Sequence, residues 1–168
     1  MAERAVECII LIGLPGAGKT SFYRRQFAET HLHVSKDLWP GSSNREERQQ
    51  KLVTQSLESG RSIVVDNTNP SLADRAQIIR VARNFGARVI GYYFDVTTRV
   101  AIARNAERQG RARVPDVAIF TTAKRLARPV FAEGFDALYR VTIAEDRSFY
   151  VTAEAVTPRS RRTPSAMS

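Results

Sequence analysis

The sequence predicts an α/β fold in which a mainly parallel sheet lies between two layers of helices. Short apolar segments rich in β-branched residues alternate with segments of helical periodicity, and such alternation is typical of parallel strands joined by crossover helices. The length of 168 residues corresponds to one domain, and a hydrophobic content of 43% is sufficient for a buried core. We expect residues 1–156 to form this domain. The Pro-, Ser- and Arg-rich residues 157–168 are expected to form a disordered basic tail.

The first predicted strand leads directly into a glycine-rich segment. Val6–Ile12 is almost continuously apolar, as expected for a strand covered on both faces, and a helix is predicted over Lys19–Glu29. Between them, Gly13-Leu14-Pro15-Gly16-Ala17-Gly18-Lys19-Thr20 fits the pattern G-x-x-x-x-G-K-[ST] at every fixed position. The glycines allow successive N–H groups to converge on a phosphate at the positive end of the helix. Residues 13–21, which end at Ser21, are therefore predicted to bind ATP, with Lys19 on the β- and γ-phosphates and Thr20 as a Mg²⁺ ligand.

The second predicted strand, His31–Ser35, is followed by an acidic residue, Asp37. A carboxylate at this edge of the sheet can accept the proton of a hydroxyl group and direct its oxygen at a γ-phosphate. The alternative is a solvated acid or the cap of a short helix. Further on, Asn44 and Glu47 form a capping-box pattern that predicts a helix ending at Gly60.

The third predicted strand, Ser62–Asp66, also ends in an acid. Asp66 stands where Walker-B-type carboxylates hold Mg²⁺, directly or through water, and it can equally face the acceptor substrate. Asn67 and Asn69 are candidate substrate residues, although asparagines before a proline are also common in turns. Ser71 then predicts the start of a helix that ends at Gly86.

A strand at Arg88–Phe94 and a helix at Thr97–Arg108 come next, with a basic loop over residues 109–114. Arg104 and Arg108 are four residues apart and so lie on one helix face, next to Arg111 and Arg113 of the loop. We predict a lid over about residues 104–115 whose arginines neutralise the transferring phosphoryl group; a solvated basic helix face is the alternative. Pro115 favours a helix to about residue 127, and 138–143 and 148–151 are predicted as two late strands that form a hairpin.

Charge and cysteine content exclude several classes of protein. The net charge is +9 and the pI is about 10.4, which suits polyanionic partners such as nucleotides and nucleic acids or simply maintains solubility. Cys8 is the single cysteine, so a disulfide framework or a multi-cysteine zinc site is excluded, and it is expected to be inert core. His31 and His33 are too few for a histidine metal centre and are interpreted as packing or solvated residues. With neither a signal peptide nor a membrane span in the sequence, we expect a cytoplasmic protein with no membrane partner.

Together these residues resemble the kinase domain of the polynucleotide 5′-hydroxyl kinase family. The similarity extends from about residue 7 to 143 and rests on the phosphate loop, Val34-Ser35-Lys36-Asp37, Asp66-Asn67-Thr68-Asn69-Pro70 with Arg75 downstream, Arg104-Asn105-Ala106-Glu107-Arg108, Val114-Pro115 and Ala132-Glu133-Gly134-Phe135. The resemblance implies a Mg²⁺-ATP-dependent kinase of the P-loop NTPase, nucleoside-kinase-like fold, with a five-stranded parallel core.

The resemblance also implies roles for individual residues. Asp37 becomes the hydroxyl-activating acid, Asp66 a substrate-side or metal-side acid, and Arg104 and Arg108 the lid arginines. The catalytic set is then Lys19, Asp37, Arg104 and Arg108, and the substrate set is Asp66, Asn67, Asn69 and Arg75. The Glu133-Gly134-Phe135 string is expected near the adenine-binding end.

Two positions depart from the family pattern and concern the acceptor. Lys36 stands where the family often has arginine, and Pro40 stands where the phage enzyme has an arginine that grips a substrate phosphate. Three hypotheses remain: phosphorylation of a polynucleotide 5′-OH, phosphorylation of a small-molecule hydroxyl, or a nucleotide-dependent module that hydrolyses ATP slowly.

Overall fold

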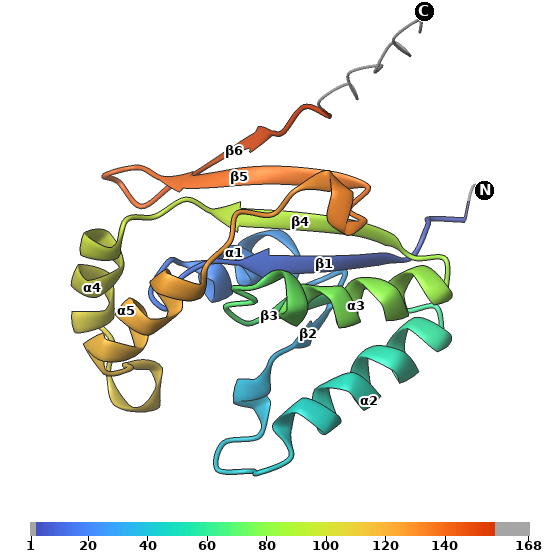
Figure 1. Cartoon of the computed structure of the whole chain (residues 1–168), viewed down its shortest axis with the longest axis horizontal. Helices are drawn as coiled ribbons and strands as arrows, with labels where there is room; N and C mark the ends of the chain where they lie inside the picture. The colour runs from blue at the N-terminus through green and yellow to red at the C-terminus, as the bar shows by residue number, and fades with distance from the viewer. Residues whose placement is uncertain (1–2, 157–168) are drawn as a thin grey trace, which may run out of the picture.

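The chain folds around one six-stranded sheet. The computed structural model describes residues 3–156, so the expected tail at 157–168 lies outside the described residues. The strand order is β2-β3-β1-β4-β5-β6. Five strands are parallel and β6 runs antiparallel to β5, which confirms the parallel core and the late hairpin (Figure 1). The strands are β1 (Glu7–Ile12), β2 (Leu32–Val34), β3 (Ile63–Asp66), β4 (Arg88–Phe94), β5 (Ala137–Ile143) and β6 (Phe149–Ala153).

The five predicted helices are present with small changes at their ends. They are α1 (Lys19–Gln26), α2 (Arg45–Glu58), α3 (Leu72–Asn84), α4 (Thr98–Ala106) and α5 (Asp116–Arg125). Short 3₁₀ turns lie at η1 (Lys36–Leu38), η2 (Gly110–Ala112) and η3 (Phe131–Glu133). None of the helices in residues 3–156 is long and apolar enough to span a bilayer.

The predicted helix cap at Ser71 and the predicted capping box of Asn44 with Glu47 have different outcomes. Ser71 Oγ accepts a hydrogen bond from the Asp74 N–H, and the Asp74 side chain accepts one from the Ser71 N–H, so α3 begins with a complete capping box. Asn44 precedes α2 as expected, but its side chain does not cap the helix. Its Oδ1 instead accepts hydrogen bonds from Ser42 Oγ and Arg48 Nε, so the predicted box with Glu47 is wrong.

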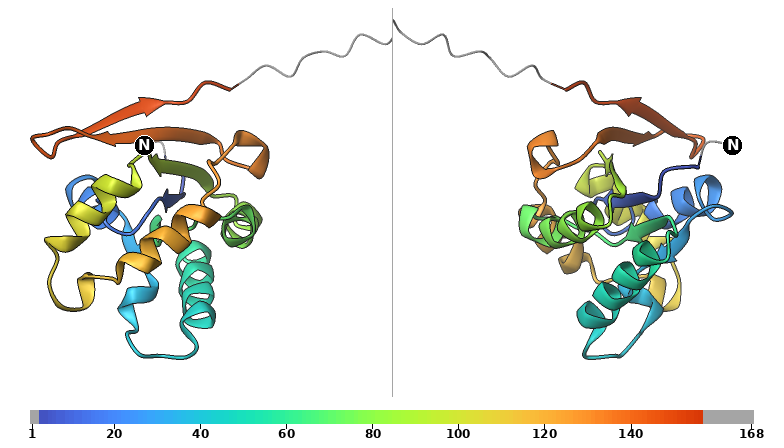
Figure 2. Two further views of the ribbon diagram at one scale, coloured as in Figure 1. Left: turned by 60° about the vertical axis from the view of Figure 1, so that its left-hand side comes forward. Right: turned by 90° about the vertical axis from the view of Figure 1, so that its right-hand side faces the viewer.

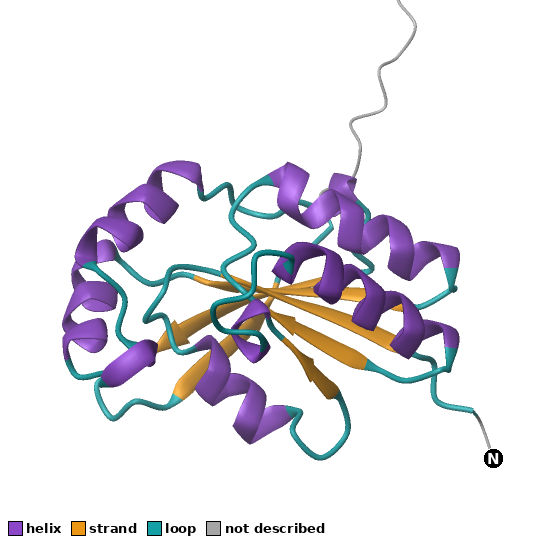
Figure 3. Cartoon of the chain, turned by 90° about the horizontal axis from the view of Figure 1, so that it is seen from below, coloured by secondary structure: helices purple, strands orange, loops and turns teal. Residues whose placement is uncertain are grey.

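Side chains from both faces of the sheet are buried. Cys8, Ile10 and Ile12 of β1 pack beneath α2 and α3, whereas Ile9 and Leu11 pack on the opposite face with residues of α1, α4 and α5. The apolar run in β1 is therefore explained as predicted, because both faces of this strand are covered. Cys8 is fully buried, and burial raises its pKa to about 12, which agrees with an inert core thiol. Figure 3 shows the helices on the two faces of the twisted sheet, and Figure 2 shows the β5–β6 hairpin along one edge.

Arg75 was expected among the substrate residues but is a buried structural residue. Its side chain is 0% exposed, and Nε and one terminal nitrogen donate to the two carboxylate oxygens of Glu133 at 2.8 and 3.1 Å. The other terminal nitrogen donates to the backbone carbonyls of Asn69 and Pro70, each at 3.0 Å. Arg75 thus joins α3 to η3 and fixes the turn that follows β3, and its fully buried guanidinium is not accessible to a substrate.

Removal of one partner of this pair is expected to destabilise the fold strongly. We predict that Arg75→Met lowers the free energy of unfolding by about 3–5 kcal/mol, because Glu133 is left as an uncompensated buried charge. The double substitution Arg75→Met with Glu133→Leu should recover part of that loss. Arg80→Met on the exposed face of α3 is the matched control and should change it by less than about 0.5 kcal/mol. Urea denaturation measures all three; a single-variant loss no larger than the control's would contradict the assignment.

Candidate active site

The phosphate loop has the backbone conformation that its glycines require. Gly16 and Gly18 adopt φ angles of +81° and +93°, in the left-handed region. A Cβ at Gly16 would lie 2.6 Å from the Ala101 carbonyl oxygen of α4, so only glycine fits there. At the start of the loop, the Gly13 N–H donates to the Thr68 carbonyl at 3.0 Å, which joins the loop after β1 to the turn after β3.

Lys19 begins α1 and is buried at the centre of this loop. Its Nζ donates to the carbonyls of Gly13 and Leu14 at 2.9 and 2.7 Å, and the residue is 7% exposed. Burial lowers the pKa of the Lys19 ammonium to about 8, although the negative charges of Asp66 and Asp37 partly oppose the shift. The Lys19 ammonium therefore loses its proton at a pH near 8, well below the usual range for lysine.

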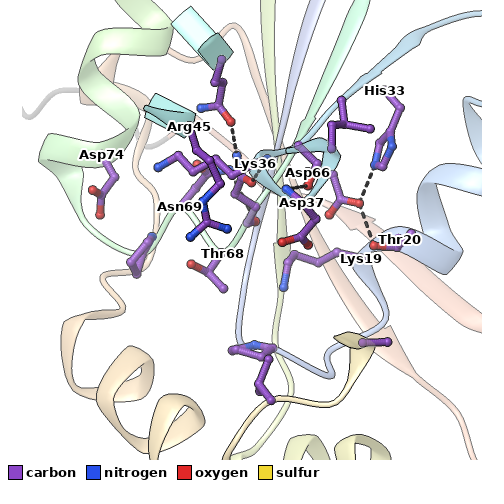
Figure 4. Close-up of a pocket in the computed structure, with 18 of the residues that line it drawn as sticks. Lys19, Thr20, His33, Lys36, Asp37, Arg45, Asp66, Thr68, Asn69 and Asp74 are labelled. Atoms are coloured by element: carbon purple, nitrogen blue, oxygen red, sulfur yellow. Dashed lines mark hydrogen bonds and ion pairs between the residues drawn. The ribbon is translucent and has the colours of Figure 1, made fainter. Parts of the chain in front are cut away.

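Asp66, at the carboxyl end of β3, accepts two hydrogen bonds through one oxygen. Thr20 Oγ1 donates to Asp66 Oδ2 at 2.7 Å, and His33 Nε2 lies 2.8 Å from the same atom (Figure 4). Burial by itself raises the pKa of the Asp66 carboxyl, but these two hydrogen bonds and the Lys19 charge outweigh it and hold the pKa below its usual value. Asp66 is thus an ionised carboxylate although it is only 5% exposed.

Asp37 lies on η1, across the same cleft. The Asp37 N–H donates to Ser35 Oγ at 3.2 Å, which caps the 3₁₀ turn. The Asp37 side chain is exposed and faces the cleft near Lys19 (Figure 4). Lys19, Thr20, Asp37 and Asp66 all line this one cleft, whose volume is about 1410 Å³. The structure therefore brings the phosphate-loop lysine and the candidate hydroxyl-activating acid to a common space.

The turn that carries Asp37 is attached to the residue after Asp66. Asn67 Oδ1 accepts a hydrogen bond from the Lys36 N–H at 3.0 Å, and Asn67 Nδ2 donates to Gln49 Oε1 at 2.6 Å. Gln49 belongs to α2 and is 3% exposed, so it fixes the orientation of the Asn67 amide. Asn67 thereby sets where Asp37 lies relative to Asp66.

Asn69 also has a structural contact. It is 5% exposed with φ of +44°, and its Nδ2 donates to the Leu11 carbonyl at 2.8 Å. This bond holds the end of β1 against the turn after β3. Asn69 lines the cleft as well.

Two arginines of the predicted lid occupy different positions. Arg104 Nε donates to the Gly16 carbonyl at 2.9 Å and packs against the phosphate loop. Arg108 lines the cleft, and one terminal nitrogen donates to the Ala112 carbonyl at 3.1 Å. Asn105 is fully buried and connects the two ends of the predicted lid. Its amide group donates to the Val114 carbonyl at 2.7 Å and accepts from the Val114 N–H at 3.0 Å.

A family model described as "AAA domain" matches residues 8–129 of the chain. The chain belongs to this AAA-domain family. Among curated proteins it is similar to a bifunctional polynucleotide phosphatase/kinase of Schizosaccharomyces pombe, with 25% identity over 133 residues, which are 77% of this chain and 32% of that protein. The chain spans about a third of the length of the curated relatives it matches.

Solved structures share the fold of this AAA-domain protein. A fungal RNA kinase superimposes with a TM-score of 0.65 at 14% identity and covers 87% of this chain and 80% of that one. A gluconokinase from Sinorhizobium meliloti 1021 superimposes with a TM-score of 0.60 at 18% identity, over 85% and 86% of the two chains. These comparisons confirm the predicted P-loop kinase fold and the resemblance to polynucleotide kinases.

Three further residues of this AAA-domain protein belong to the site although no sequence motif pointed to them: His33, Gln49 and Arg45. His33 was interpreted as packing or solvated, but it bonds Asp66 and stacks on Tyr23 with ring centroids 4.3 Å apart. The sequence does place His33 on the strand that leads to Asp37, and this position could have indicated that its side chain lies near the site. Gln49 and Arg45 gave no signal, because only the packing of α2 beside η1 brings them to the cleft.

The Glu133-Gly134-Phe135 string does not lie beside the phosphate loop. Glu133 binds Arg75, and Phe135 is in the core on the α2 and α3 face of the sheet, opposite α1. These residues therefore make structural contacts and do not line the cleft that holds Lys19, and their position near adenine stays a prediction.

The residues present fit a bound magnesium ion. Mg²⁺ prefers oxygen ligands and is commonly held by one or two protein groups together with substrate phosphates. Thr20 Oγ1 and the ionised Asp66 carboxylate supply such oxygens side by side. Within residues 3–156 there is no cluster of three or more His, Cys, Asp or Glu residues that would hold a metal by protein ligands alone.

The lowered pKa of Lys19 predicts a proton linked to nucleotide binding. In the free protein the Lys19 ammonium loses its proton as pH rises through about 8, whereas bound phosphates stabilise the charged form. ATP binding at pH 8.5 should therefore take up roughly 0.8 proton, and the affinity should fall as pH rises further. Calorimetry in buffers of different ionisation enthalpy measures this uptake. Lys19→Arg, which stays protonated, should bind without it; equal uptake in both proteins would assign the proton to another group.

Proposed function

We propose that this chain is an ATP-dependent kinase that transfers the γ-phosphate of ATP to the 5′-hydroxyl of a polynucleotide. The observation that carries the proposal is the meeting of Lys19 and Asp37 in one cleft beside the Thr20–Asp66 pair. A P-loop kinase needs a phosphate cradle and an acid that faces the acceptor. The similarity to a polynucleotide phosphatase/kinase supports the choice of acceptor.

The reaction assigns a distinct task to each side chain. Asp37 accepts the proton of the acceptor hydroxyl, the hydroxyl oxygen forms a bond to the γ-phosphorus, and the bond from that phosphorus to the bridging oxygen breaks, which releases ADP. Lys19 and Arg108 stabilise the charge on the transferring group. Thr20 and Asp66 would hold Mg²⁺, which neutralises phosphate charge when it is bound. Because Asp37 is exposed and Asp66 is buried with its hydrogen bonds made, Asp37 rather than Asp66 is assigned to the acceptor.

The charge of the cleft favours a polynucleotide over a metabolite as the acceptor. The cleft has a volume of about 1410 Å³, which includes the space beside the phosphate loop. It is lined by more basic than acidic side chains: Lys19, Arg24, Lys36, Arg45, Arg108, Arg111 and Arg125 against Asp37, Glu46, Asp66 and Asp74. A positive surface of this kind attracts the phosphate backbone of a nucleic acid. Pro40 lines the cleft without a charge, and Arg45 adds a cation to the same lining.

A kinase assay with matched variants tests the proposal. The wild-type protein with Mg²⁺ and γ-labelled ATP should label a 5′-OH oligonucleotide but not its 5′-phosphorylated counterpart. Asp37→Asn should lower turnover by about 10²–10⁴-fold and leave ATP affinity unchanged, because the Asp37 side chain lies outside the phosphate loop. Lys19→Ala should abolish ATP binding.

Two outcomes would contradict the proposal in different ways. Labelling of a sugar or nucleoside with no labelling of any 5′-OH oligonucleotide would identify a small-molecule kinase. ATP hydrolysis that is unaffected by acceptors and by Asp37→Asn would identify an ATPase module.

A further inference from the structure

A second, smaller groove lies on the other side of the first turn of α2. Its volume is about 430 Å³, and it is lined by Trp39, the neutral polar residues Asn44 and Gln55, Glu47, Arg48, Lys51 and Leu52. Trp39 directly follows η1 and is half-buried, so part of its indole faces solvent. The mechanism proposed above uses none of these side chains.

The loop over residues 39–44 and the first turn of α2 lie between the groove and the main cleft. Leu38 and Pro40 line the cleft, whereas Trp39 between them lines the groove. Gly41, at the start of the loop, has no atom within 4 Å of the position that a Cβ would take. The loop is therefore open at Gly41, on the side from which a chain bound in the cleft would approach the groove.

Three cations on α2 connect the two spaces. Arg45 lines the cleft, and Arg48 and Lys51 line the groove. Residues three apart in a helix rise by about 4.5 Å and differ by roughly 60° around the axis, so the three charges follow one oblique path. Arg45, Arg48 and Lys51 form no salt bridge with any acid in residues 3–156, although Lys36 and Arg125 at the cleft do.

We propose that this groove binds the nucleotides that follow the reacting 5′ end of a single strand. The inference rests on the proposed function and extends it from the terminal hydroxyl to the length of the acceptor. Arg48 and Lys51 are suited to successive phosphates, and the exposed part of Trp39 to stacking with a base. Glu47, the one acid among the groove residues, opposes this binding. The preferred acceptor is consequently an unpaired strand of several nucleotides.

Substrate length separates the groove from the catalytic cleft. With wild-type protein, a 5′-OH decanucleotide should have a lower KM than a 5′-OH dinucleotide. Trp39→Ala should raise the KM for the decanucleotide by about 10-fold, with less than about a twofold change for the dinucleotide or ATP. Trp39→Phe should retain most of the affinity. Glu47→Gln should act in the opposite direction and lower the KM for the decanucleotide.

Direct binding gives a readout that does not depend on turnover. Anisotropy of a labelled decanucleotide without ATP should show weaker binding for Arg48→Gln with Lys51→Gln, with a salt slope smaller by about 1.4. Arg80→Gln, an exposed arginine of α3, is the matched control and should bind as the wild type does. The proposed role of the groove would be overturned if the Trp39 and Arg48/Lys51 variants bound the decanucleotide as tightly as the wild type does. It would also be overturned if polyglutamate, but not unlabelled oligonucleotide, competed with the labelled decanucleotide. Groove-dependent binding without any phosphorylation would overturn the proposed function alone.

Discussion

The two hydrogen bonds to Asp66 hold the ligand-binding edge of the sheet together. Thr20 follows β1, His33 belongs to β2 and Asp66 ends β3, so one carboxylate oxygen joins three neighbouring strands at their carboxyl ends. A carboxylate this buried needs such partners, because burial alone favours the neutral acid. With Asp66 kept ionised next to Thr20, the phosphate loop faces a negative, oxygen-rich site, and every other proposed role depends on that position.

The two acids of the cleft differ because their surroundings differ. Asp66 is buried and bonded to His33 and Thr20, whereas Asp37 is exposed on a 3₁₀ turn. Carboxylates in contrasting environments commonly divide the work of one site. Asn67 couples them, since it follows Asp66 in the chain and accepts the N–H of Lys36, the neighbour of Asp37. Gln49 of α2 orients that amide, so the helix that carries Arg45, Arg48 and Lys51 also fixes the catalytic turn. Helix α2 therefore contributes both to the groove proposed to bind the acceptor and to the contact that positions Asp37.

Local sequence patterns predicted what local interactions determine. The apolar run of β1, the phosphate-loop pattern and the Ser71 cap each depend on residues close in the chain, and all three are present. The strand order places residues after β1, β2 and β3 at one edge, which is why Lys19, Asp37 and Asp66 were predicted to meet. Arg75 was misassigned because its partner Glu133 is 58 residues away, and a motif does not distinguish a buried arginine from one that binds substrate. His33 was missed because alternation along a strand tells which face a side chain occupies but not what the adjoining strand presents.

A crystal structure of the protein with a non-hydrolysable ATP analogue, Mg²⁺ and a 5′-OH oligonucleotide tests the central claim most directly. The account predicts that the terminal phosphate contacts Lys19 Nζ and that the 5′-hydroxyl oxygen lies about 2.6–3.2 Å from an Asp37 carboxylate oxygen, in line with that phosphate. A 5′-hydroxyl bound against Asp74 or outside the cleft, with Asp37 in solvent, would contradict it.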